Sequence, residues 1–144
     1  MGQQQPVDLD RRLKETINYQ SEMLHYGMYT AGYSRPFQTD IPWHWHEEFE
    51  IIYCAKGTLN LRIPSKTYVI EQNDIAILNT NVMHYIICSN DAILQSFVFN
   101  SKLITGTSNS SFAKKYIVPL MNCKTFDCYI YHEKNIDLFR EAFY

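Results

Sequence analysis

The chain has 144 residues, the length of one ordinary domain that can bury a core of its own. Hydrophobic residues make up 46% of the sequence and aromatic residues 15%, which favours a compact, β-rich structure and argues against a disordered one. The formal net charge of −2 argues against the basic surface that a protein needs to bind nucleic acid unaided.

Cysteine usage and hydropathy predict the compartment. The four cysteines lack Cys-x-x-Cys spacing: Cys54, Cys88, Cys123 and Cys128. The N-terminal residues contain no apolar stretch that could serve as a secretion signal or a membrane span. We therefore predict a cytoplasmic protein without membrane contact, whose thiols are reduced and pack as small hydrophobic residues.

Residues 1–24 are predicted to form an N-terminal arm or a short helix. Four apolar residues recur at near-helical spacing ahead of Gly27: Leu9, Leu13, Ile17 and Leu24. An amphipathic helix over this stretch would turn its apolar side toward the rest of the domain and cap it.

Residues 25–100 are predicted to form a β-barrel from a series of short strands. Apolar residues alternate with polar ones over 59–63, a Pro-Ser-Lys turn follows, and a second apolar run covers 68–70. These three features together predict a hairpin. Further short apolar runs cover Ile75–Leu78, 85–88 and Ile93–Phe99. This spacing indicates an antiparallel barrel or sandwich whose interior could hold a small ligand.

One segment of this region has the residue types of a metal site. His44, His46, Glu50 and Gly57 form the pattern His-x-His-x3-Glu-x6-Gly. In an extended strand the two imidazoles and the carboxylate have the same parity, so their side chains point the same way. Neutral imidazole and carboxylate are common ligands of divalent metals. The segment therefore predicts a converging polar site.

The opposite face of this segment leaves a second interpretation open. Five residues of opposite parity are apolar, interrupted only by Glu47: Trp43, Trp45, Phe49, Ile51 and Tyr53. An ordinary half-buried strand with a solvated polar face has the same alternation. The segment alone does not decide between a ligand-binding face and a solvated one.

A later run, residues 73–84, ends on a further histidine, His84. We expect Asn73 and Asn81 to adopt the left-handed turn conformations that glycine usually supplies. Together with the first segment, this run resembles the two motifs of the cupin family. Five signature positions are replaced, at Gln38 in the first motif and at Asn73, Asn79, Asn81 and Cys88 in the second. The resemblance implies a mainly β fold, the double-stranded β-helix or jelly-roll barrel, followed here by C-terminal helices. It also implies one set of ligands: His44, His46, Glu50 and His84.

Residues 101–144 are predicted to form a C-terminal helical segment. A loop rich in Gly, Ser and Asn covers 106–111, and the pattern over 135–144 is helical. Five apolar residues of this last stretch predict a homodimer, with packing on the barrel of the same chain as the alternative: Ile136, Leu138, Phe139, Ala142 and Phe143. No C-cap closes the pattern at Tyr144, so we expect a truncated helix, or a linker that continues in a longer protein.

Four segments together resemble the sensor domain of AraC-type (AraC/XylS) transcription regulators over residues 25–144. They are 43–53, 73–75 with His84, 97–100, and the Lys-Tyr-Ile-Val-Pro-Leu run at 115–120. The resemblance implies a barrel that binds a small effector, such as a sugar or a related metabolite, and helices that dimerise. It also implies DNA binding through a C-terminal helix-turn-helix region, which these 144 residues lack.

The resulting hypothesis is a small-molecule-sensing regulatory domain rather than an enzyme. The resemblance implies either that the four candidate residues hydrogen-bond the effector without a cofactor, or that they hold a divalent metal. The alternative function is a small metal-dependent cupin enzyme, an isomerase or a dioxygenase, with the same four residues as ligands. These residues are His44, His46, Glu50 and His84.

Overall fold

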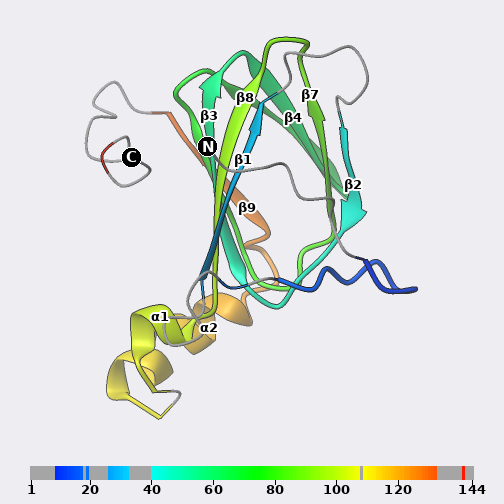
Figure 1. The fold of residues 1–144 in the computed structure, drawn as a ribbon. Coiled ribbons are helices and arrows are strands. Elements are labelled where there is room, and N and C mark those ends of the chain that lie inside the picture. Colours follow the sequence, from blue (N-terminus) through cyan, green and yellow to red (C-terminus); the bar gives the residue numbers. More distant parts are fainter. Residues whose placement is uncertain are drawn as a thin grey trace.

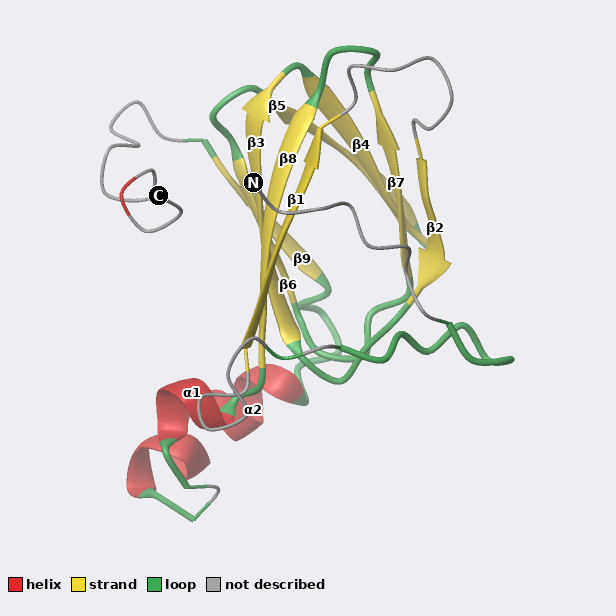
Figure 2. Cartoon of the chain, viewed as in Figure 1, coloured by secondary structure: helices red, strands yellow, loops and turns green. Residues whose placement is uncertain are grey.

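The computed structural model describes residues 9–17, 19, 26–32, 40–107, 109–132 and 141, and for 28–32 the backbone alone. In these parts of the chain, two antiparallel sheets face each other and a short helical segment lies at one end of them (Figures 1 and 2). The predicted mainly β jelly-roll fold with helices after the barrel is confirmed.

The first sheet has five strands in the order β1-β8-β3-β6-β9. Their bounds are β1 (Tyr26–Gly32), β8 (Ile93–Phe99), β3 (Phe49–Lys56), β6 (Ile75–Leu78) and β9 (Cys128–Tyr131). The second sheet has four strands in the order β2-β7-β4-β5. Their bounds are β2 (Asp40–His44), β7 (His84–Cys88), β4 (Thr58–Ile63) and β5 (Lys66–Glu71). Because consecutive strands often lie in different sheets, residues distant in sequence meet between the two layers.

The core lies between the sheets and follows the alternation of the strands. Leu59, Leu61 and Ile63 of β4 are buried whereas Arg62 is exposed, and β4 pairs with β5 so that Ile63 lies opposite Lys66. The hairpin predicted here is therefore confirmed. Buried residues of both sheets complete the core, among them Ile52, Ile70, Leu78, Ile86 and Leu94.

Three turns depend on backbone conformations with positive φ. Asn73 and Asn81 have φ of 74° and 63°, which confirms the left-handed conformations predicted for these asparagines. Gly57 has φ of 75°, and a Cβ there would lie 2.6 Å from Ser89 Oγ and 2.9 Å from Ala92 Cα. Only glycine fits this turn between β3 and β4 without displacing the backbone of the next loop.

The helical segment covers one end of the five-stranded sheet. It consists of α1 (Lys102–Thr105), η1 (Ala113–Ile117) and α2 (Val118–Met121). Ile117 packs against Phe49 and Phe99 on the outer face of the sheet. Asn79 holds the end of the segment, because its amide nitrogen donates to the carbonyl oxygens of residues 120 and 126, each at 3.0 Å.

After these helices the chain returns to the sheet as β9, which pairs with β6 from Ile75↔Tyr131 to Leu78↔Cys128. The segment predicted to be helical from 101 to 144 is therefore only partly helical where it is described. The helix predicted over 135–144 lies outside the described residues except for Glu141. The apolar residues proposed for dimerisation lie outside them as well.

The N-terminal segment was predicted to form an arm or a short helix, and its described residues 9–17 form an arm. Residues 9–17 contain no helix: Leu9 and Glu15 form an antiparallel bridge, and Leu13 has φ of 63°, which a helix does not allow. The near-helical spacing of Leu9, Leu13 and Ile17 therefore belongs to an extended arm with a tight turn. Leu24 lies outside the described residues.

Two further expectations from the sequence concern the cysteines and membrane-spanning segments. Cys54 and Cys88 are buried, and none of the four cysteines forms a disulfide with another described residue. Burial raises the pKa of Cys54 to about 11, so this thiol stays protonated and packs as a small hydrophobic residue. No helix in the described part of the chain is long and apolar enough to cross a membrane.

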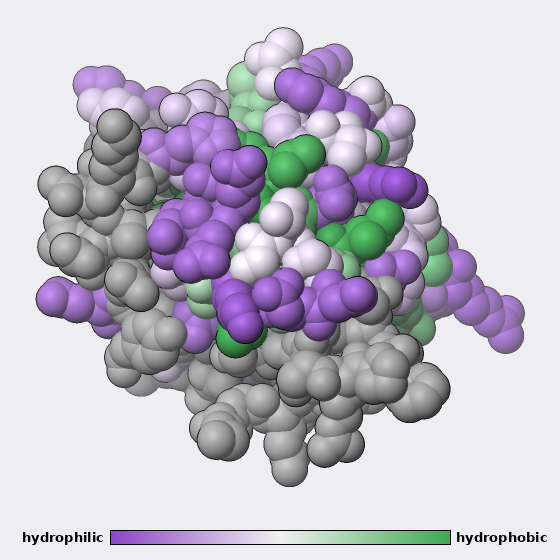
Figure 3. All heavy atoms as spheres, turned by 90° about the horizontal axis from the view of Figure 1, so that it is seen from above, coloured by the Kyte–Doolittle hydropathy of each residue, from purple (hydrophilic) through white to green (hydrophobic). Residues whose placement is uncertain are grey.

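Seen from above, hydrophilic residues dominate the described surface, with hydrophobic residues scattered among them (Figure 3).

Candidate metal and effector site

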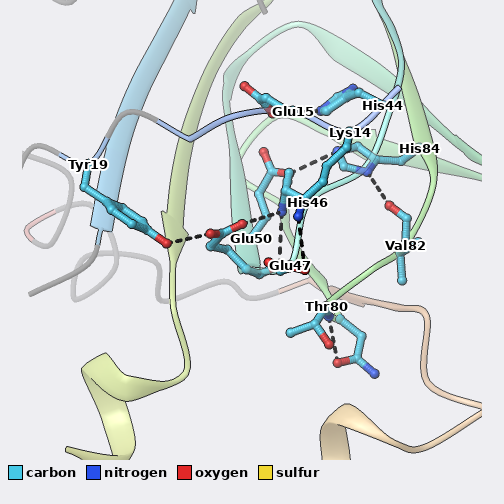
Figure 4. Close-up of polar contacts among 12 residues, drawn as sticks. Lys14, Glu15, Tyr19, His44, His46, Glu47, Glu50, Thr80, Val82 and His84 are labelled. Carbon is cyan, nitrogen blue, oxygen red and sulfur yellow. Dashed lines mark hydrogen bonds and ion pairs between the residues drawn. The ribbon is translucent and has the colours of Figure 1, made fainter. Parts of the chain in front are cut away.

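The four candidate residues converge from both sheets. His44 ends β2, His84 begins β7 directly opposite it, Glu50 lies in β3, and His46 lies in the link between β2 and β3. One possible ligand atom from each residue lies within 4.8 Å of all the others. Figure 4 shows their side chains turned toward one another. The structure thus brings together all four residues that the spacing had singled out.

Burial decides between the two faces of the first segment. His44, His46, Glu50 and His84 are between 1% and 6% exposed, so they do not form a solvated strand face. On the opposite face of the segment, Phe49 and Tyr53 are buried as well, because the outer side of the sheet packs against other parts of the chain. Buried ionisable groups at this density need partners or a bound ion.

Each imidazole of the cluster is oriented by the backbone. The Nδ1 atoms of His44, His46 and His84 lie 2.7 Å from Pro42 O, 3.1 Å from Glu48 O and 2.8 Å from Val82 O. A carbonyl oxygen only accepts, so each Nδ1 carries the proton and donates it. In a neutral ring the lone pair is then on Nε2. This arrangement fixes the tautomer that metal-binding histidines use.

The three Nε2 atoms face carboxylates. Those of His46 and His84 both lie 3.1 Å from Glu50 Oε2. The His84 Nε2 atom is buried and has no partner in hydrogen-bond geometry despite this short distance. His46 Nε2 and Glu50 Oε2 have hydrogen-bond geometry, whereas a lone pair on His84 Nε2 and the carboxylate oxygen repel unless a proton or a cation lies between them. The arrangement fits a divalent cation, which all four residues could bind at once.

The electrostatics of the cluster agree with this geometry. Burial, together with His84, lowers the pKa of His44 to about 4, so this imidazole is neutral at pH 7 and available as a ligand. Burial would lower the pKa of His46, but the hydrogen bond and charge of Glu50 raise it overall. Burial would likewise raise the pKa of Glu50, yet His46 and His84 hold it well below its usual range. A carboxylate therefore persists in a nearly dry environment.

Two neighbours of the cluster were not predicted from the sequence. Ser96 of β8 donates its hydroxyl proton to Glu50 Oε1 at 2.5 Å and orients the carboxylate. Glu15 of the N-terminal arm places Oε2 3.6 Å from His44 Nε2. Burial and then the charge of Glu50 raise the pKa of Glu15 to about 7. Strand parity could have placed Ser96 on the inner face, whereas the helix predicted for the arm concealed Glu15.

Comparison with protein families identifies the domain. Residues 28–135 match the family described as AraC-like ligand binding domain. The chain belongs to this family. The resemblance to AraC-type sensor domains is confirmed, and the AraC-like chain is a small-molecule-sensing regulatory domain.

A comparison with curated proteins finds no significant match.

Solved structures with the same fold include ToxT from Vibrio cholerae. The AraC-like chain is similar to a 1.65 Å structure of ToxT with 17% identity and a TM-score of 0.58, over 82% of this chain and 47% of that one. A ToxT structure bound to (E)-4-(8-methylnaphthalen-1-yl)but-3-enoic acid gives 14% identity, a TM-score of 0.58, and coverage of 82% and 46%. A ToxT structure with bound unsaturated fatty acid has 12% identity and a TM-score of 0.56, over 81% of this chain and 44% of that one. The chain spans less than half of each ToxT chain, and at these identities the likeness shows the fold alone.

Proposed function

We propose that this AraC-like domain senses a small polar effector at the cluster of His44, His46, Glu50 and His84, and that a divalent metal held there takes part. The observation that supports it most is the convergence of three backbone-oriented imidazoles on one buried carboxylate. A set of three imidazole nitrogens and one carboxylate oxygen suits first-row metals such as Zn, Fe, Mn or Ni.

The four residues leave room in the coordination sphere of such a metal. A six-coordinate ion bound by four protein ligands has further positions for exchangeable oxygen ligands. When bound, the metal would attract hydroxyl or carboxylate oxygens of an effector. Sugars, sugar acids and related metabolites carry these groups, which is why we propose them as the effector class.

Thermal unfolding tests the sensing proposal. A compound that binds the folded state stabilises it by about 2.7 kcal/mol when its concentration is 100 times Kd. We expect some sugars, sugar acids or hydroxy acids to raise Tm of the metal-loaded protein. The rise should be absent in His84→Gln and retained in His132→Gln, a matched control because His132 is exposed and lies outside the cluster. Failure of every such compound to shift Tm of the wild type would contradict the sensing proposal.

The donor set itself supports a second candidate, a small metal-dependent cupin enzyme. Three histidines and one carboxylate with open positions can also polarise a bound substrate or activate water. Turnover of a stabilising compound separates the two candidates. An enzyme would convert it in a metal-dependent way, whereas a sensor would return it unchanged.

We further propose that the chain forms a homodimer through the apolar residues over 136–143. Sedimentation of the wild type beside Leu138→Asp and Phe139→Asp tests this. A dimer that dissociates only in the two variants would support the proposal. A monomer for all three proteins at high concentration would remove it.

A further inference from the structure

The N-terminal arm is joined to the segment that carries two of the proposed ligands. Glu15 N donates to Trp45 O at 2.8 Å, and Trp45 N donates to Leu13 O at 3.0 Å. The Trp45 indole donates to Arg12 O at 3.0 Å. These bonds hold residues 12–15 alongside Trp45, which lies between His44 at the end of β2 and His46 in the link to β3.

Neighbouring side chains of the arm point in opposite directions. Lys14 points outward and pairs with the exposed Glu47, with Nζ and Oε1 3.1 Å apart. Glu15 points inward, and its side chain is only 12% exposed. Farther along the arm, the Tyr19 hydroxyl donates to Glu48 Oε1 at 2.5 Å. In Figure 4 the Glu15 carboxylate lies beside the His44 ring, at the edge of the cluster.

The neutral His44 ring supplies no proton to its contact with Glu15. His44 Nδ1 donates to Pro42 O, so in the neutral ring Nε2 carries a lone pair. This lone pair faces Glu15 Oε2 at 3.6 Å. Two electron-rich atoms at that distance need either a proton on the Glu15 carboxyl or a cation that both can bind.

Charge balance points to the same cation. Three imidazoles that bind through unprotonated Nε2 atoms, together with the Glu50 carboxylate, would leave a divalent ion with one uncompensated positive charge. A second carboxylate would neutralise it, and an excess charge is costly to bury. Among the described residues of the arm, Glu15 contacts the cluster at His44, although the ligand atoms that lie within 4.8 Å of one another come from the other four residues.

We propose that Glu15 is a further metal ligand, delivered by the N-terminal arm, so that metal binding and arm docking stabilise each other. This inference rests on the proposed metal site. It assigns the arm a direct part in that site, because a metal bound to Glu15 would add to the hydrogen bonds that hold residues 12–15 beside Trp45. An arm that leaves would take one ligand with it.

Metal titration of the full chain tests the proposal, with Ni²⁺ and Co²⁺ as the probes. We expect Glu15→Gln to bind either ion roughly tenfold more weakly or worse than the wild type, as loss of a ligand or its support typically does. Glu47→Gln is the matched control, because it removes an exposed arm contact and no ligand. Its affinity should stay within about threefold of the wild type, since exposed ion pairs contribute little.

Two further readouts separate a ligand from a residue that merely positions others. The visible spectrum of the Co²⁺-loaded protein should change in Glu15→Gln, because it reports the number and type of ligands, and stay unchanged in Glu47→Gln. Trypsin cleavage after Arg11, Arg12 and Lys14 should be slowed by metal in the wild type and not in Glu15→Gln. Glu15→Asp, which keeps the charge on a shorter chain, should have an intermediate affinity.

The outcomes distinguish the two proposals. If the wild type binds neither ion, the metal site itself is wrong and the role of Glu15 falls with it. If the wild type binds metal and Glu15→Gln matches it in affinity and spectrum, the four-residue site stands and the inference about Glu15 is overturned.

Discussion

Each histidine of the cluster has one ring nitrogen committed to a backbone carbonyl, so the other nitrogen has a fixed direction. Spacing predicted His44, His46, Glu50 and His84, because parity along a strand is a local property that the sequence displays. It did not predict Glu15, which reaches the cluster only because residues 9–17 form an arm. That contact depends on the tertiary structure, and no spacing along the chain encodes it.

Ser96 provides a residue-scale prediction. Ser96→Ala removes the hydroxyl that donates to Glu50 Oε1, and loss of a hydrogen bond to a buried charged acceptor costs about 1.5–3 kcal/mol. We expect urea unfolding to show this loss and metal affinity to fall by about tenfold, because the carboxylate is no longer oriented. Ser65→Ala, at an exposed turn, is the control and should change neither. Unaltered metal affinity in Ser96→Ala would show that Glu50 is held without this hydroxyl.

A second residue-scale prediction concerns pH in the metal-free protein. The folded-state pKa of Glu15 is raised to about 7, so its protonation stabilises the folded state below about pH 4.5, and this contribution is lost as pH rises through about 7. The contribution of His44 to stability has the opposite pH dependence. The folded-state pKa of His44 is lowered to about 4, so protonation favours the unfolded state as pH falls below about 6.5. Relative to Glu15→Gln, the wild type should therefore lose stability from about pH 5 to pH 7.5. Urea unfolding with a chelator present measures the free energy of unfolding of both proteins against pH. If the two proteins show the same pH dependence, the raised pKa of Glu15 is contradicted.

At the scale of elements, the sequence predicted the strands of the barrel well. The apolar runs at Ile75–Leu78 and Ile93–Phe99 coincide with β6 and β8. Short apolar segments bounded by turn residues typically form strands. Of the arm or short helix predicted at the N-terminus, the described residues 9–17 form an arm, since three apolar residues at near-helical spacing also fit an arm with a turn at Leu13. Strand β9 (Cys128–Tyr131) was missed because these residues fell in the segment predicted to be helical, and their pairing with β6 is nonlocal.

The turn at Gly57 provides an element-scale prediction. Gly57→Ala would force a left-handed conformation on alanine and bring its Cβ 2.9 Å from Ala92 Cα, so we expect a loss of about 2–5 kcal/mol in free energy of unfolding. Gly106→Ala is a matched control, because Gly106 has φ of 69° but nothing lies within 4 Å of its added Cβ. This control should lose only about 1–2 kcal/mol. Equal losses by urea unfolding would show that close packing at Gly57 is unimportant.

At the scale of the whole molecule, family membership follows from features spread over the chain rather than from the cluster alone. The two cupin-like motifs indicated the barrel, and the Lys-Tyr-Ile-Val-Pro-Leu run at 115–120 indicated the regulator. In the structure this run spans η1 and α2, and Ile117 packs on the outer face of the five-stranded sheet. A barrel motif therefore predicts a fold that many functions share, whereas a segment outside the barrel narrows the function.

A whole-molecule prediction concerns DNA. The net charge of −2 gives this chain little electrostatic attraction to a phosphate backbone, which supplies most of nonspecific binding. We expect fluorescence anisotropy at physiological salt to show no sequence-dependent binding by the 144-residue chain. Tight binding to one sequence and not to a scrambled one would contradict this expectation.

Metal content tests the central claim most directly. The account predicts that the wild type, exposed to a slight excess of Ni²⁺ or Zn²⁺ and then desalted, retains about one ion per chain by atomic spectrometry. It predicts that Glu50→Gln and His84→Gln retain almost none, while His132→Gln retains as much as the wild type. A wild type that retains no metal, or variants that retain as much as it does, would contradict the claim that these four residues form a metal site.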